Sequence, residues 1–132
     1  QADIKREGSD VTVVSFGKLM KVALEAAEEA AKDNISVEVI DLRTVRPIDY
    51  ATVVESVKKT NRLVIVEEAW PLAAISSEIT YHIQKHAFDY LDAPIHRINS
   101  MDVPLPYAPT LIDEILPNTN RTLQAIKDVM YR

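Results

Sequence analysis

The chain has 132 residues, of which 47% are apolar and 27% charged, and 20 acidic side chains outnumber 15 basic ones. These proportions are typical of one globular domain, and the net charge of −5 argues against non-specific binding to nucleic acid or to an anionic membrane. The absence of cysteine excludes disulfides and thiolate chemistry, and the only two glycines, Gly8 and Gly17, are too few for a phosphate-binding loop or a dinucleotide-binding turn.

The first ten residues are polar and charged, and the first residue is Gln1 rather than methionine. They lack the apolar core of a signal peptide. We therefore expect residues 1–10 to be a linker or N-terminal extension in a chain that begins inside a longer protein, and the folded domain to occupy residues 11–132. No apolar run approaches the roughly 18 residues that a membrane-spanning helix needs.

Strands and helices are predicted to alternate along this domain. Short apolar, β-branched runs predict buried strands, and apolar residues that recur every three or four positions predict helices. The predicted strands are residues 11–16, 37–42, 63–67 and 95–98, and the predicted helices start near residues 19, 50, 73 and 119, with Asn34 ending the first and Asp49 capping the second. This alternation predicts an α/β fold, a three-layer sandwich with a mostly parallel sheet and helices on both faces.

Two segments are predicted to be loops. Met101–Pro117 contains Pro104, Pro106 and Pro109 in addition to its last residue. Because proline fixes φ and lacks an N–H donor, we expect an ordered, mostly non-helical loop there, with a short helical turn near residues 111–115. Trp70–Pro71 marks a second loop.

The search for a catalytic or metal-binding group finds little. His82 and His86 have the i,i+4 spacing that can place two imidazoles on one metal ion, but no Glu follows His82 directly and no third ligand is evident. They are predicted to pack at the edge of an apolar helix face. His96 stands beside Arg97, but Ser76, Ser77 and Ser100 lack the flanking glycines of a nucleophile turn. No catalytic, metal or cofactor-binding residue is therefore predicted.

Two charged pairs keep alternative interpretations. Glu67 and Glu68 end a predicted parallel strand, where doubly wound sheets bind ligands, although a strand end that meets solvent is the simpler interpretation. Arg43 and Arg46 share one loop and can bind a phosphate or carboxylates, or pair with acids across a subunit contact. The sequence does not separate these cases.

Several segments are similar to one known family. Asp41–Asp49 resembles the C-terminal domain of the transketolase-like thiamine-diphosphate enzymes, and Lys58–Glu67 followed by Trp70–Pro71 resembles the β subunit of the 2-oxoacid dehydrogenase first component. Ala87–Pro94 and Asp102–Ala108 resemble the pyruvate-specific branch of that family. The resemblance covers essentially the whole chain.

The resemblance implies an oxidative decarboxylase of pyruvate that uses thiamine diphosphate and Mg²⁺. It would be an α₂β₂ heterotetramer, containing the α subunit and a second β subunit, and would pass its acetyl group to the dihydrolipoyl acetyltransferase. In this family the cofactor lies between the α subunit and the N-terminal domain of β, so we expect this domain to bind no cofactor and to be inactive alone. The implied location is the mitochondrial matrix or the bacterial cytoplasm.

The family assigns assembly to this domain, through β–β pairing and docking of the subunit-binding domain of the acetyltransferase. One docking aspartate belongs to the motif Leu91–Pro94, so Asp92 is the first candidate contact. The C-terminal carboxylate, here of Arg132, is the second, although a cationic last side chain departs from the apolar end of the family. Without the resemblance, Asp92 would be interpreted as a turn acid before a strand.

Three alternatives remain open at this stage. The chain could belong to a branched-chain 2-oxoacid or acetoin dehydrogenase β subunit, because the substrate pocket lies outside it. It could be a freestanding α/β protein-interaction module, or a small enzyme acting at Glu67 and Glu68. Residues 72–78 also depart from the family, since alanine and serine replace a glycine-containing stretch there.

Overall fold

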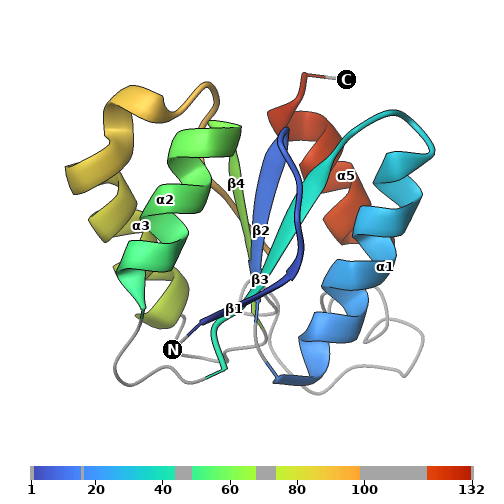
Figure 1. Cartoon of the computed structure of the whole chain (residues 1–132), viewed down its shortest axis with the longest axis horizontal. Coiled ribbons are helices and arrows are strands. Elements are labelled where there is room, and N and C mark those ends of the chain that lie inside the picture. Colours follow the sequence, from blue (N-terminus) through green and yellow to red (C-terminus); the bar gives the residue numbers. More distant parts are fainter. Residues whose placement is uncertain (1, 16, 44–48, 68–73, 99–118, 132) are drawn as a thin grey trace, which may run out of the picture.

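The computed structural model describes residues 2–15, 17–43, 49–67, 74–98 and 119–131 (Figure 1). Its five-stranded sheet has the order β1-β3-β2-β4-β5. The strands are β1 Asp3–Arg6, β2 Val11–Ser15, β3 Val37–Asp41, β4 Leu63–Val66 and β5 His96–Ile98. The helices are α1 Met20–Ala31, α2 Tyr50–Thr60, α3 Ala74–Ala87 and α5 Thr119–Val129, with 3₁₀ turns η1 Gly17–Leu19 and η2 Phe88–Tyr90.

The sheet is the middle layer of three. Strands β2 to β5 pair in parallel, α1 and α5 lie on one face, and α2 and α3 lie on the other (Figure 1). Alternate side chains of each central strand point to opposite faces. Val13 and Val39 therefore belong to the core with α1 and α5, whereas Val14 and Ile40 belong to the core with α2 and α3. The predicted three-layer α/β fold is confirmed.

The stretch 1–10, predicted as a linker, contributes a strand that the sequence did not reveal. Strand β1 pairs antiparallel with β3, so that Asp3 faces Asp41 and Ile4 faces Ile40. Among the described strands, β1 is paired along one edge only, and Ile4 is exposed. An edge strand of this kind does not need the apolar run that marks a buried strand, which explains why its sequence reads as polar.

The joint between β1 and β2 depends on a glycine. A Cβ atom at Gly8 would lie 2.3 Å from the backbone carbon of Val37, which is far inside van der Waals contact. The same residue donates its N–H to Glu38 Oε1 at 3.2 Å. Residue 8 therefore has to be glycine for the chain to run this close to β3.

The helix ends follow the predicted signals. Asp49 caps α2 by accepting a hydrogen bond from Thr52 N–H at 3.2 Å, and hydrogen bonds from the Thr52 hydroxyl and N–H lower the pKa of its carboxyl although burial opposes them. Asn34, after α1, has the left-handed φ of 63° expected of a helix stop.

Some predictions fall outside the described residues. These are the loop Met101–Pro117 with its turn at 111–115, the loop Trp70–Pro71, and residues 72–73 of the departure from the family. In the parts of the chain that the structure describes, none of the helices combines the length and the apolar character needed to cross a membrane.

Candidate docking surface

Asp92 lies in the loop between η2 and β5, and its main chain is held on both sides. Its N–H donates to the carbonyl of Asn61 at 2.8 Å, and its carbonyl accepts a hydrogen bond from the Tyr131 hydroxyl at 3.3 Å. The side chain itself remains 57% exposed. The carboxylate is thus presented to solvent from a fixed backbone position.

Three segments that are distant in sequence build this position. Strands β4 and β5 are parallel neighbours, so the loops that enter them lie side by side. Asn61 ends α2 in the left-handed conformation, with φ of 67°, and its side-chain amide donates to the carbonyl of Tyr90 at 2.7 Å. The end of α5 reaches the same edge of the sheet, as the contact of Tyr131 with Asp92 shows.

Arg62 is the cation beside Asp92. Its Nε donates to the carbonyl of Val129 at 3.0 Å, which ties the start of β4 to the end of α5. Its Nη1 lies 3.9 Å from Asp92 Oδ2. This pair is at the outer limit of a salt bridge, and the Asp92 carboxylate remains open to a second cation.

Exposed aromatic side chains lie in the same segments. Phe88 is 65% exposed, Tyr90 43% and Tyr131 71%. Exposed aromatic residues beside arginine and a charged group are typical of binding hot spots. We call the group formed by Arg62, Phe88, Tyr90, Asp92 and Tyr131 the Asp92 surface.

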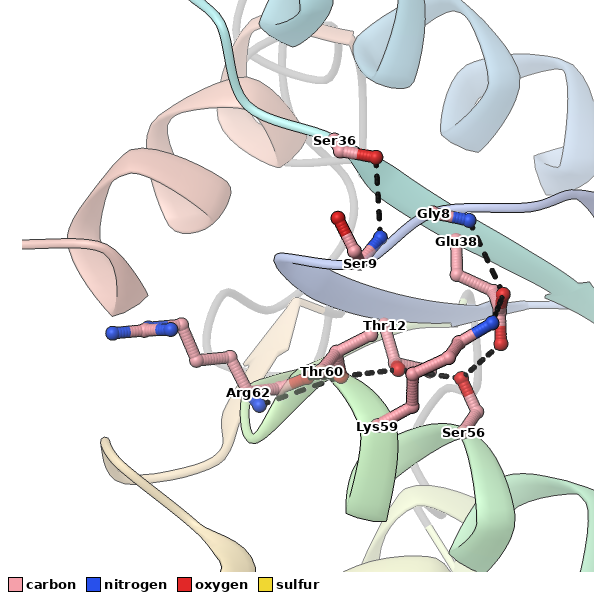
Figure 2. Close-up of polar contacts among 9 residues, drawn as sticks. All are labelled: Gly8, Ser9, Thr12, Ser36, Glu38, Ser56, Lys59, Thr60 and Arg62. Carbon is pink, nitrogen blue, oxygen red and sulfur yellow. Dashed lines mark hydrogen bonds and ion pairs between the residues drawn. The ribbon is translucent and has the colours of Figure 1, made fainter.

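A second carboxylate, Glu38 in β3, is buried instead (Figure 2). Ser56 Oγ donates to its Oε2 at 2.6 Å, Lys59 Nζ pairs with its Oε1, and Gly8 N–H donates to the same oxygen. Burial raises the pKa of Glu38, but the hydrogen bonds from Lys59, Ser56 and Gly8 together outweigh it and bring the pKa below the ordinary 4.5. Glu38 is therefore ionised inside the protein.

Thr12 in β2 extends this buried network. Its Oγ1 lies 2.6 Å from Ser56 Oγ and 2.7 Å from Thr60 Oγ1, and Thr60 Oγ1 donates to the carbonyl of Arg62 at 3.1 Å (Figure 2). The network joins β2 and β3 to α2. Sequence reasoning missed it, although a threonine and a glutamate inside otherwise apolar strands were a usable signal.

Of the histidine pair, His82 is half-buried and packs as predicted, whereas His86 is exposed. The His82 ring stacks on Tyr50 with centroids 4.0 Å apart, and His86 lies 4.4 Å away from it. Burial, followed by the charges of His86 and Lys85, lowers the pKa of His82. Within the described ranges no group of three His, Asp or Glu side chains stands together.

The other candidates are not brought to the Asp92 surface. Glu67 is completely buried, and its N–H donates to the carbonyl of Ile98 at 3.0 Å. Arg43 is exposed, and its N–H donates to Asp41 Oδ1 at 2.8 Å. Glu68, Arg46 and Arg132 lie outside the described residues. Both interpretations of Arg43 and Arg46, anion binding and a subunit contact, therefore stay open, and the contact of the C-terminal carboxylate stays a prediction.

The sequence of the chain is similar to those of known proteins. The chain is 52% identical over 131 residues to the pyruvate dehydrogenase E1 component subunit β of Rickettsia conorii, covering 99% of the chain and 40% of that protein. It is 51% identical over 132 residues to the mitochondrial subunit of the same name from Dictyostelium discoideum, covering 100% of the chain and 37% of that protein. The chain thus spans about two fifths of the length of these relatives.

Solved structures and family models agree on the domain. A split-gene transketolase, described as an inactive β4 tetramer, superposes with a TM-score of 0.84 at 23% identity, over 99% of this chain and 41% of that one. At this identity the likeness shows the fold alone. The family model described as "Transketolase, C-terminal domain" matches residues 1–122. The chain therefore belongs to the transketolase C-terminal domain family.

Proposed function

We propose that this chain is the C-terminal domain of a pyruvate dehydrogenase first-component β subunit and that its own task is assembly. The whole enzyme would decarboxylate pyruvate oxidatively as an α₂β₂ heterotetramer. About 50% identity over the whole chain to β subunits with that name supports pyruvate as the substrate, ahead of the branched-chain and acetoin alternatives. Relatives from mitochondria and from bacteria fit the mitochondrial matrix or the bacterial cytoplasm.

In the whole enzyme, thiamine diphosphate with Mg²⁺ would supply the carbanion that attacks the carbonyl group of pyruvate. We place their binding outside this domain. The chain spans only about two fifths of the length of its relatives, which leaves the larger part of such a subunit for cofactor binding. No catalytic step is assigned to these residues.

The task proposed for the domain is docking of the subunit-binding domain of a dihydrolipoyl acetyltransferase at the Asp92 surface. The observation that carries it is the exposed carboxylate of Asp92 on a main chain fixed by Asn61 and Tyr131. A preordered acid costs little entropy when a cation binds it. The net charge of −5 also favours encounter with a basic partner.

Asp92→Asn tests this proposal. The variant keeps the shape of the side chain and removes its charge, so we expect it to fold normally. Calorimetric titration with the purified subunit-binding domain should show binding weakened by about 2–5 kcal/mol if the ion pair is buried on docking. A pair that stays exposed at the rim would lose at most about 1 kcal/mol.

Glu28→Gln is the matched control, because Glu28 is an exposed acid of helix α1 and is not part of the Asp92 surface. It should bind the subunit-binding domain like the unmodified chain. If Asp92→Asn also binds with unchanged affinity, Asp92 is not part of the interface and the docking proposal fails.

The carboxylate of Arg132 is the second contact that we propose. The hydroxyl group of Tyr131, one residue earlier, donates a hydrogen bond to the carbonyl of Asp92, which supports a shared partner for the two positions. Deletion of Arg132 moves the carboxylate by one residue and should lower the affinity. Equal affinity after the deletion would exclude this contact.

A further inference from the structure

The Asp92 surface contains Arg62, a cation that would repel a basic partner. Attraction between Asp92 and such a partner therefore does not account for it. A site that binds a basic partner through Asp92 would bind it more strongly with no cation of its own nearby. Arg62 nevertheless places Nη1 3.9 Å from Asp92 Oδ2. The position of Arg62 therefore bears on how the partner binds.

Arg62 is held independently of Asp92. Its carbonyl accepts hydrogen bonds from Thr12 N–H at 2.9 Å and from Thr60 Oγ1 at 3.1 Å, and its Nε donates to the carbonyl of Val129 at 3.0 Å. The side chain is only 22% exposed. The guanidinium would thus stay in place when the surroundings of Asp92 change.

The carboxylate of Asp92 is less restrained than this cation. It is 57% exposed, and its separation from Arg62 exceeds hydrogen-bond length. A cation from a partner could approach it more closely than Arg62 does. It would then lie near Arg62, and the two positive charges would repel each other.

We infer that Arg62 is a built-in counter-ion of Asp92, with which a cationic partner has to compete for the carboxylate, and that Arg62 thereby limits the strength of docking. The inference rests on the proposed function, because it assumes that Asp92 receives a cation of the subunit-binding domain. Docking then replaces the ion pair between Asp92 and Arg62 by one between Asp92 and a cation of the partner. The aromatic side chains of Phe88, Tyr90 and Tyr131 supply contact area that this exchange does not weaken.

The test is a double-mutant cycle on the 132-residue chain, with calorimetric titration of the subunit-binding domain. Arg62→Gln removes the charge and keeps a donor for the carbonyl of Val129. It should tighten binding by about two- to fivefold, the range of exposed ion pairs. In the Asp92→Asn background the same change should leave the affinity unchanged.

Two further variants separate charge from other causes. Arg62→Lys keeps the cation and should bind like the unmodified chain, while thermal unfolding of each variant shows that the fold is intact. Lys58→Gln removes another cation at the end of α2, which lies over the Tyr90 ring at 5.5 Å. It should have the same effect on affinity whether or not Asp92 is present, because Lys58 does not pair with Asp92.

The outcomes separate this inference from the proposed function. If Asp92→Asn weakens binding but Arg62→Gln weakens it or leaves it unchanged, the counter-ion inference is wrong and docking at Asp92 stands. An equal effect of Arg62→Gln in both backgrounds also overturns the inference. If Asp92→Asn has no effect on binding, the proposed function itself fails.

Discussion

Two of the carboxylate–cation pairs in the described residues have cations that lie close together in sequence, Lys59 and Arg62, but the two pairs differ in environment. Glu38 pairs with Lys59 of α2, and Asp92 pairs with Arg62, which follows α2. Glu38 is 1% exposed and also accepts hydrogen bonds from Ser56 and Gly8, whereas Asp92 is mostly exposed and its pair is 3.9 Å long. Burial thus commits the first carboxylate to the fold and leaves the second available to a partner.

The largest change in the free energy of unfolding is expected from removal of the buried carboxylate of Glu38. Glu38→Ala removes the acceptor of Ser56, Lys59 and Gly8 and leaves a buried hole. The free energy of unfolding should fall by about 3 kcal/mol, measured by urea denaturation. Glu55→Ala is the matched control, because Glu55 forms an exposed pair with Lys58 at 3.7 Å. If Glu55→Ala lowered the free energy of unfolding as much as Glu38→Ala, burial would not be the cause of the larger effect.

A smaller effect should follow from pH, since acid removes only the charge of Glu38. The pKa of Glu38 is lower in the folded protein than its ordinary 4.5, so the folded state binds this proton less readily than the unfolded state. The resulting stabilisation is present above pH 4.5 and is lost as the pH falls through the folded pKa. Denaturation midpoints measured between neutral and acidic pH should fall less for Glu38→Gln; parallel curves would show that other acids dominate.

The next effect isolates the hydroxyl at the centre of the buried network. Thr12→Val keeps the shape of the side chain but removes its contacts with Ser56 and Thr60. We expect a loss of about 1 kcal/mol in the free energy of unfolding. Tyr131→Phe, which removes one exposed hydrogen bond to Asp92, is the comparison, and a loss at least as large in this variant would break the contrast between the two regions.

The smallest effect on the free energy of unfolding is expected at Asp92, where the effect on binding should be large. Asp92→Asn should change the free energy of unfolding by no more than about 0.5 kcal/mol, because the side chain is exposed. Its affinity for the subunit-binding domain should nevertheless fall. A strongly destabilised variant would show that Asp92 supports the fold rather than docking.

The pattern of the sequence predicted most of the fold for a simple reason. The strands at Val11–Ser15, Val37–Asp41 and Leu63–Val66 are apolar on both sides because helices cover both faces of the sheet. Such strands produce continuous apolar runs. Strand β1 was missed because it lies at the edge of the described sheet. An edge strand does not need the continuous apolar run of a buried strand, so its polar residues gave no strand signal.

The site could be predicted only in part. The motif around Asp92 made this residue the first candidate for a partner contact, but the segments that fix its main chain come from the end of α2 and the end of α5. Local patterns contain no information on such distant pairings. The roles of Arg62 and Tyr131 therefore became visible only with the structure, and the same holds for the contact of Glu38 with Lys59.

Strand β1 also has a consequence for the solution behaviour of shortened forms of the domain. It covers the backbone donors and acceptors along the outer side of β3, and its own short length includes an Asp3–Lys5 ion pair and an irregular register between Ile4 and Arg6. Charges and irregularities of this kind discourage strand-to-strand aggregation. A protein shortened to begin at Val11 would lose this protection and offer the unpaired backbone edge of β3 to its neighbours.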